Sequence, residues 1–190
     1  MIEVSHVSAD YGGQDVLKDL SFSLPQGENL AILGPNGCGK TTLLRVMAGL
    51  LPCRGDVRVD GRSIARMKPR ELAAHIGLMS QNMQIPFDYT VEDVVRMGRY
   101  RMRRRGLFEA ENREDGQAVR DALETVGLWE LRNRTANTLS GGQQQRVFLA
   151  RVFAQQPEIV MLDEPTNHLD LSSQIELMQQ LRLYGSQPNR

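Results

Sequence analysis

The sequence predicts an α/β fold with a parallel core sheet, preceded by an antiparallel β region and interrupted by a helical region. The apolar runs at residues 30–33 and 159–162 are continuous, as expected of strands that are covered on both faces. Helix-period apolar patterns lie between and after these runs. Because buried strands that alternate with helices form parallel sheets, we expect residues 1–190 to fold as one α/β domain.

Composition limits the class of protein. The chain has 190 residues, of which 41% are hydrophobic and 24% charged, values that suit a folded globular domain. Its net charge is zero, so overall charge points neither to nucleic acid nor to an anionic membrane. Cys38 and Cys53 form neither a metal-ligand spacing nor a disulfide framework. The N-terminus does not resemble a signal peptide and no apolar run reaches the length of a membrane span, so a partner would have to bring the chain to a membrane.

The N-terminal region is expected to form a half-exposed antiparallel sheet. Residues 2–7 and 16–24 alternate in polarity, and a turn at residues 11–14 separates them. The elements expected next are a helix at 41–51 and short strands at 56–59 and 77–79.

The remainder of the chain is mainly helical by pattern. Helices are expected at residues 91–97, 113–126, 141–155 and 172–183. Residues 184–190 have the composition of a loop. The apolar side of the last helix is formed by Ile175, Leu177, Met178 and Leu181.

Residues 34–41 match the phosphate-binding pattern G-x-x-x-x-G-K-[ST], which predicts a P-loop NTPase core; the alternative is a chance glycine-rich turn. Glycines let the backbone turn its N–H groups toward anionic oxygens, and the following helix adds its positive end. Lys40 is expected to reach the β- and γ-phosphates as a flexible charge in a chain that otherwise uses arginine almost throughout. The hydroxyl of Thr41 can hold Mg²⁺. The predicted phosphate-binding residues are Gly34, Pro35, Asn36, Gly37, Cys38, Gly39, Lys40, Thr41 and Thr42.

An acidic pair, Asp163 and Glu164, follows the apolar run at residues 159–162. Ligands bind beyond the carboxyl ends of parallel strands, so carboxylates at this point are candidates for chemistry. Asp163 would hold Mg²⁺, and Glu164 would accept a proton from an attacking water. The alternative is a solvated acidic turn before Pro165.

The segment Leu-Ser-Gly-Gly-Gln at residues 139–143 predicts a second anion site. Ser140 has the character of a helix N-cap, with Gly141 and Gly142 at the mouth of the helix. A simple P-loop ATPase does not need such a site. The phosphate loop, this segment and the apolar strand with Asp163 and Glu164 occur in the order that resembles the nucleotide-binding domains of ABC transporters, and the likeness runs from Ile2 to Leu183.

The resemblance implies a head-to-tail dimer of two such domains that hold ATP between them. Ser140, Gly141, Gly142 and Gln143 would then contact the ATP that is bound to the phosphate loop of the partner. Tyr11 matches the aromatic residue that stacks on adenine, with packing within the turn as the alternative.

Two further positions are assigned by the same resemblance. Gln81 matches the glutamine that contacts Mg²⁺ and the attacking water and touches the membrane partner, with a plain loop amide as the alternative. Residues 167–170 resemble the loop that crosses the dimer interface, where Asp170 is the expected contact.

The resemblance also implies partners and a location. The chain would be the ATPase subunit of an importer, bound to integral membrane permease subunits on the cytoplasmic side of the inner membrane and acting indirectly on a substrate-binding protein. Residues 86–108 are most similar to the helical region of importers for iron–siderophore, haem or cobalamin complexes. The arginines in this region are interpreted as a solvated loop or a contact with an acidic partner, and nucleic-acid binding is not expected because few aromatics are interleaved; they are Arg99, Arg101, Arg103, Arg104 and Arg105.

The sequence departs from the family pattern in one respect. Its histidines are His6, His75 and His168, and none stands where the family has a histidine that contacts the γ-phosphate. We therefore expect a chain truncated at its C-terminus, in which a central strand is missing. An ATP-binding domain that does not hydrolyse ATP, and a soluble ABC ATPase of DNA repair or translation, are the alternatives to an importer ATPase.

Overall fold

The computed structural model describes residues 1–81, 85, 87–100, 113–167 and 169–185. The chain divides into an N-terminal unit, Met1–Leu78, and a C-terminal unit, Met79–Arg190. No helix within the described ranges is long and apolar enough to cross a bilayer.

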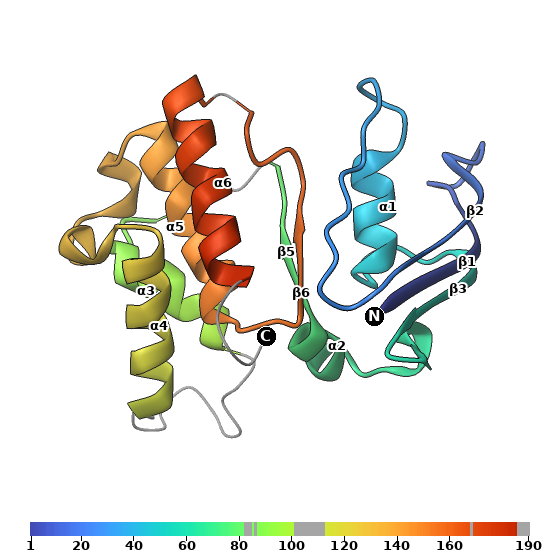
Figure 1. The fold of residues 1–190 in the computed structure, drawn as a ribbon, viewed down its shortest axis with the longest axis horizontal. Coiled ribbons are helices and arrows are strands. Elements are labelled where there is room, and N and C mark those ends of the chain that lie inside the picture. Colours follow the sequence, from blue (N-terminus) through green and yellow to red (C-terminus); the bar gives the residue numbers. More distant parts are fainter. Residues whose placement is uncertain (82–84, 86, 101–112, 168, 186–190) are drawn as a thin grey trace. The chain divides into compact units, whose positions relative to one another are not determined.

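The N-terminal unit is built on a four-stranded antiparallel sheet (Figure 1). The strand order is β2-β1-β3-β4, with β1 at Ile2–Ala9, β2 at Leu17–Leu24, β3 at Arg54–Val59 and β4 at Arg62–Ser63. The alternation in β1 shifts at His6, whose φ of 51° accompanies a shift in register. Ile2 and Val4 before the shift and Val7 and Ala9 after it are all buried. The predicted antiparallel sheet is confirmed.

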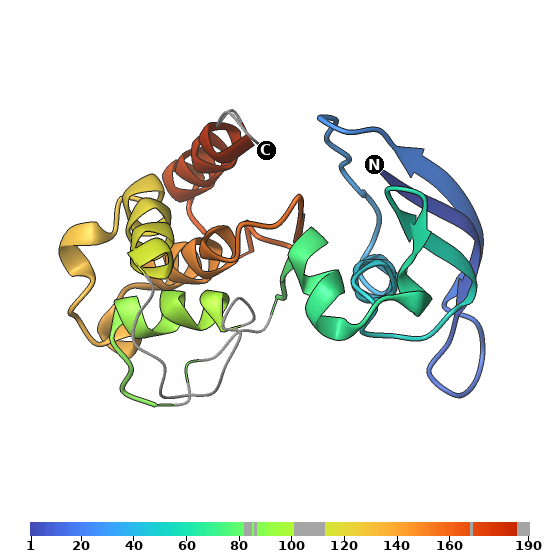
Figure 2. The ribbon, with the colours of Figure 1, turned by 90° about the horizontal axis from the view of Figure 1, so that it is seen from below.

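The helix α1, Lys40–Met47, packs on this sheet, and Figures 1 and 2 both show it beside β1. It is shorter than the predicted helix at 41–51 because Gly49 adopts a φ of 68° and its N–H donates to the Val46 carbonyl at 2.9 Å. A short 3₁₀ turn at Ile64–Arg66 and the helix α2 at Pro69–His75 complete the unit.

Residues 30–33 contradict the prediction of a buried strand. They form no strand, and Leu30 and Leu33 are 48% and 90% exposed. A strand covered on both faces needs neighbouring strands, and none of the described segments pairs with this one. The prediction from composition was therefore wrong. An apolar composition shows that a segment favours burial, but it does not show whether a neighbouring strand is available to pair with it.

The strands β5, Ile76–Met79, and β6, Ile159–Leu162, lie side by side as a parallel two-stranded sheet (Figure 1). The N–H of Asp163 continues the ladder by donating to the Met79 carbonyl at 2.9 Å. The predicted strand at 159–162 is thus confirmed, and it ends directly before the acidic pair. Its predicted complete burial is wrong, because only Met161 of its four residues is buried.

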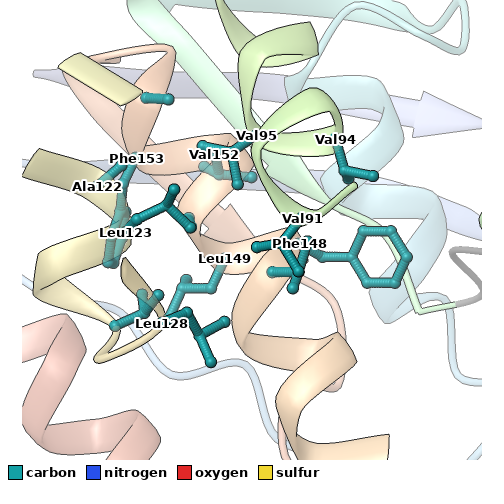
Figure 3. Packing of buried hydrophobic residues seen from close by; sticks show 14 of the residues in the cluster. Val91, Val94, Val95, Ala122, Leu123, Leu128, Phe148, Leu149, Val152 and Phe153 are labelled. Carbon is teal, nitrogen blue, oxygen red and sulfur yellow. The ribbon is translucent and has the colours of Figure 1, made fainter. Parts of the chain in front are cut away.

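Helices form the core of the C-terminal unit (Figure 3). Val91, Val95, Leu123, Leu149 and Phe153 have at most 1% of their surface exposed and pack together there. The α-helices are α3 at Val91–Arg96, α4 at Arg113–Thr125, α5 at Gly141–Ala154 and α6 at Leu171–Gly185, and the 3₁₀ turns are Met97–Arg99, Trp129–Leu131 and Ala136–Thr138.

The last helix differs from its prediction in two ways. It continues through Tyr184 and Gly185, which were expected to be loop, because Tyr184 is buried and stacks on Phe153 with ring centroids 3.8 Å apart. Of its predicted apolar side, Leu177 is buried, whereas Ile175 and Met178 are about half exposed. Together with Leu171, these last two form an exposed apolar stripe on α6.

Candidate nucleotide-binding site

The phosphate loop has the backbone that anion binding requires. Gly37 and Gly39 have φ angles of 80° and 102°, in the left-handed region that favours glycine. Gly39 is the N-cap of α1, and a β-carbon there would lie 3.0 Å from a methyl group of Leu17. The first turn of α1 contains no acidic residue, so the positive end of the helix is available to an anion.

Lys40 folds back over the loop. Its Nζ donates to the carbonyl oxygens of Gly34 and Pro35 at 3.0 and 3.1 Å. The ammonium group is therefore held against the first two residues of the phosphate loop, and the positive end of α1 follows the last residues of the same loop. Thr41 is half-buried and Thr42 is buried at the same helix start.

Tyr11 presents its ring to solvent, with 58% of its surface exposed. Its hydroxyl lies 3.4 Å from the Thr42 Oγ1 on α1. The hydrogen bond with Thr42 and, secondarily, Arg45 lower the pKa of Tyr11. The ring is thus tied to the helix of the phosphate loop by its hydroxyl, and more than half of the residue is exposed. Stacking of Tyr11 on adenine remains a prediction.

In the C-terminal unit the structure gathers Gln81, Glu164 and Asn167. Glu164 has a left-handed backbone with φ of 49°, and its Oε2 accepts hydrogen bonds from Gln81 Nε2 and from Asn167 Nδ2. Asp163, next to it, is only 4% exposed. The sequence had indicated Gln81 and Glu164 but missed Asn167, which was considered only as part of an interface loop.

The contact fixes the direction of the Gln81 amide. An ionised carboxylate accepts hydrogen bonds and cannot donate them, so the NH₂ group of Gln81 must face Glu164. Its oxygen Oε1 takes no part in this contact and is the atom that could bind a cation. In the C-terminal unit the candidate cation ligands are the Asp163 carboxylate and the Gln81 carbonyl, and both offer oxygen, the donor that Mg²⁺ prefers. In the N-terminal unit the Thr41 hydroxyl is an oxygen donor of the same kind.

The start of α5 has the predicted N-cap. Ser140 Oγ accepts from the N–H of Gln143 at 3.3 Å, and Gln143 Oε1 accepts from the N–H of Ser140 at 3.1 Å, which together form a capping box. A serine hydroxyl that accepts one hydrogen bond can still donate its own proton. Ser140 and the N–H groups of Gly141 and Gly142 are therefore donors at a positive helix end.

Asp170 has a structural role of its own. Its Oδ1 accepts from the N–H of Ser173 at 2.8 Å and its Oδ2 from the Ser173 hydroxyl at 3.1 Å, which caps the start of α6. These bonds lower the pKa of Asp170. The predicted interface contact at Asp170 remains a prediction, and its neighbour His168 lies outside the described residues.

The prediction of a solvated arginine-rich segment is wrong at one position. Arg99 is not part of a solvated loop, because it is 4% exposed and its Nε donates to Asp115 Oδ1 at 2.8 Å. Its Nη1 also donates to the Ala154 carbonyl at 2.9 Å and to Gln156 Oε1 at 3.0 Å. Arg101, Arg103, Arg104 and Arg105 lie outside the part of the chain that the structure describes.

The phosphate loop at the start of α1, together with strand β6 and its acidic end, defines a P-loop NTPase domain. The ABC transporter family matches residues 17–167. The chain therefore belongs to the ABC transporter family.

Comparison with known proteins agrees with this assignment. The chain is 44% identical over 172 residues to the ferric enterobactin transport ATP-binding protein FepC of Escherichia coli, covering 90% of this chain and 63% of FepC. It is 41% identical over 191 residues to the hemin import ATP-binding protein HmuV of Bradyrhizobium diazoefficiens, covering 96% and 68%. The chain thus spans roughly two thirds of the length of these relatives. Among solved structures, the dimeric post-hydrolysis state of the ATP-binding cassette MJ0796 with ADP and Pi matches with a TM-score of 0.81 and 28% identity, over 98% of this chain and 83% of that one.

Proposed function

We propose that the chain binds ATP and hydrolyses it as the energy-coupling subunit of an ABC importer. The observation that carries this proposal is the phosphate loop, in which the left-handed Gly37 and Gly39 lead into α1 and the ammonium group of Lys40 contacts the first two residues of the loop. The proposed substrate class is an iron–siderophore, haem or cobalamin complex, and the names of FepC and HmuV, which describe ATP-binding proteins for ferric enterobactin transport and hemin import, support its first two members.

In this proposal the phosphate chain of ATP lies on residues 34–42 and its adenine stacks on Tyr11. Lys40 exchanges its two carbonyl contacts for phosphate oxygens, whose full charges bind an ammonium more strongly than neutral carbonyls do. Thr41, Asp163 and Gln81 would hold Mg²⁺, which when bound offsets phosphate charge. Glu164 accepts the proton of the attacking water.

Glu164 suits the role of general base because of its contacts. Gln81 and Asn167 both donate to Oε2, so the carboxylate is held in one orientation and Oε1 is not used in either contact. A base that is already held in its reactive orientation lowers the activation free energy, because little entropy is lost in orienting it during the reaction.

A second copy of the chain completes each site. We propose that Ser140, Gly141, Gly142 and Gln143 approach the γ-phosphate of ATP bound to the phosphate loop of the partner, with Asp170 near the dimer interface. The dimeric MJ0796 structure with ADP and Pi supports such an arrangement. Permease subunits would contact the segment near Gln81 and hold the dimer peripherally at the cytoplasmic face of the membrane, with a substrate-binding protein acting through them. No nucleic acid is required.

The test is Mg²⁺-ATP turnover by the 190-residue chain and by Glu164→Gln. We expect the variant to bind ATP as tightly as the parent and to lose about 10²- to 10⁴-fold in turnover, the range for a general base. Glu158→Gln is the matched control, because Glu158 is an exposed glutamate that precedes β6 as Glu164 follows it.

Two outcomes would contradict the proposal in different ways. ATP binding without turnover in the parent chain would support the non-hydrolysing alternative. Equal turnover by the parent and by Glu164→Gln would remove Glu164 from the chemistry.

A further inference from the structure

The turn that carries Tyr11 is fastened to strand β3 by one arginine. Nη2 of Arg54 donates to both carboxylate oxygens of Asp15, each at 2.7 Å, and Nη1 of Arg54 lies 3.7 Å from Asp10 Oδ2. Asp10 stands immediately before Tyr11, and Asp15 stands near the end of the turn. Arg54 therefore interacts with both ends of the segment that presents the ring.

The Asp10 carboxylate also shapes the turn from inside. Its Oδ1 accepts from the N–H of Gly12 at 2.6 Å, a contact that closes the chain around Tyr11. The N–H of Val16 donates to the Ala9 carbonyl at 2.9 Å and closes the base of the same turn. Asp10 thus contacts Arg54 and also shapes the backbone around Tyr11. The position of the Tyr11 ring is therefore linked to Arg54.

Arg54 is a fixed anchor for this turn. It pairs with Ser8 in the β1–β3 ladder. The next residue, Gly55, has a φ of 88°, and a β-carbon there would lie 2.3 Å from the His6 carbonyl oxygen. The backbone that carries Arg54 is thus packed directly against β1, and the arginine reaches from this rigid strand to the turn.

We propose that Arg54 is a positioning residue for Tyr11 and thereby sets the affinity of the site for the base of the nucleotide, separately from its affinity for the phosphates. This inference rests on the proposed function, in which Tyr11 stacks on adenine. Two attachments then hold the ring: its hydroxyl contacts Thr42, and the turn that bears it is held by Arg54 through Asp10 and Asp15. Of these residues only Thr42 belongs to the proposed phosphate-binding segment, residues 34–42, whereas Asp10, Asp15 and Arg54 lie outside it.

The experiment measures the dissociation constants of ATP and of inorganic triphosphate by calorimetry for the 190-residue chain and its variants. Because exposed ion pairs contribute little, we expect Arg54→Ala and Asp15→Asn to weaken ATP binding by about two- to fivefold. Triphosphate binding should stay within about 1.5-fold, because it needs no base contact. Tyr11→Ala should weaken ATP binding by about three- to tenfold.

Arg58→Ala is the matched control. Arg58 also lies on β3, is also exposed, and pairs through Nε with Asp56 Oδ2 at 2.7 Å, but Asp56 is on β3 and not in the turn that carries Tyr11. It should leave both dissociation constants unchanged.

In the double variant Tyr11→Ala with Arg54→Ala, the second change should add less than about 1.5-fold to the loss of ATP affinity, because the effects of coupled residues are not additive. Arg54→Lys should recover part of the ATP affinity that Arg54→Ala loses. A lysine reaches Asp15, but its ammonium lacks the planar guanidinium geometry that matches a carboxylate.

Several results would overturn the inference. If Tyr11→Ala weakens ATP and Arg54→Ala does not, Arg54 has no positioning role while the proposed stacking stands. If the two losses multiply in the double variant, Arg54 acts on the nucleotide by another route. If Arg54→Ala weakens triphosphate as much as ATP, the effect is on the whole loop and not on the base. If neither single variant affects ATP while triphosphate and ATP still bind, the stacking role of Tyr11 fails together with that of Arg54.

Discussion

Replacing Arg99 with methionine should destabilise the C-terminal unit strongly. Arg99 and Asp115 are only 4% and 9% exposed, and the guanidinium also satisfies the Ala154 carbonyl at the end of α5 and the Gln156 side chain. The variant keeps a long apolar stem but leaves the Asp115 charge buried without its partner. Breaking a buried pair from one side costs about 3–5 kcal/mol.

This loss is large compared with the total stability of a typical domain, about 5–15 kcal/mol. The assay is urea denaturation followed by far-ultraviolet circular dichroism. Arg99→Met should move the midpoint to lower urea, and the additional change Asp115→Asn should restore part of the loss by removing the buried charge. Arg120→Met is the control, because Arg120 pairs with Glu124 at 2.8 Å on an exposed helix face and should have a much smaller effect.

The reasoning would be refuted if Arg99→Met unfolded at the same urea concentration as the parent chain. It would also be refuted if the double variant were less stable than Arg99→Met alone, since that would mean that the Asp115 charge does not cause the loss.

Three further predictions concern caps and core. Ser140→Ala removes the N-cap of α5 and should lower the unfolding free energy by about 0.5–2 kcal/mol in urea titrations, whereas Ser140→Asp, also a good cap, should not. Phe153→Ala should cost about 3–5 kcal/mol by the same measurement, because Phe153 is 1% exposed and loses its stacking on Tyr184; a change below 1 kcal/mol would contradict the packing described. The contacts with Ser173 lower the pKa of Asp170 in the folded state, so its contribution to stability is complete above the usual aspartate pKa and is lost as pH falls through the folded pKa. The difference in melting temperature between the parent chain and Asp170→Asn should therefore shrink on acidification below about pH 4 and be constant near neutrality; a difference that grows at low pH would refute the assignment.

Local patterns in the sequence were enough to locate most elements. The alternation at residues 2–7 correctly predicted β1, and the serine followed by glycines at 140–142 correctly predicted the N-cap of α5. Both features depend on interactions within a few residues along the chain. The helices around the core were likewise found from their apolar spacing.

Features that depend on distant partners could not be predicted. Arg99 lies in an arginine-rich segment and was expected in solvent, but its partner Asp115 is sixteen positions away and its other contacts lie on α5 and beyond. Asn167 was not recognised as a partner of Glu164, because an asparagine between Thr166 and His168 has the composition of an ordinary loop. For residues 30–33 the composition was right for a strand, but strand formation depends on a neighbour that composition does not reveal.

The exposed apolar segment at residues 30–33 has a practical consequence for work with this chain. It is short, apolar and uncharged, it forms no strand, and Leu33 is 90% exposed, so it presents an apolar segment to which a second copy of the chain can bind. We expect the purified chain to self-associate as its concentration rises, and a charged substitution at Leu33 to suppress this. Because the segment runs directly into Gly34, any strand that adds to it will also stiffen the mouth of the phosphate loop, so aggregation and nucleotide affinity should change together.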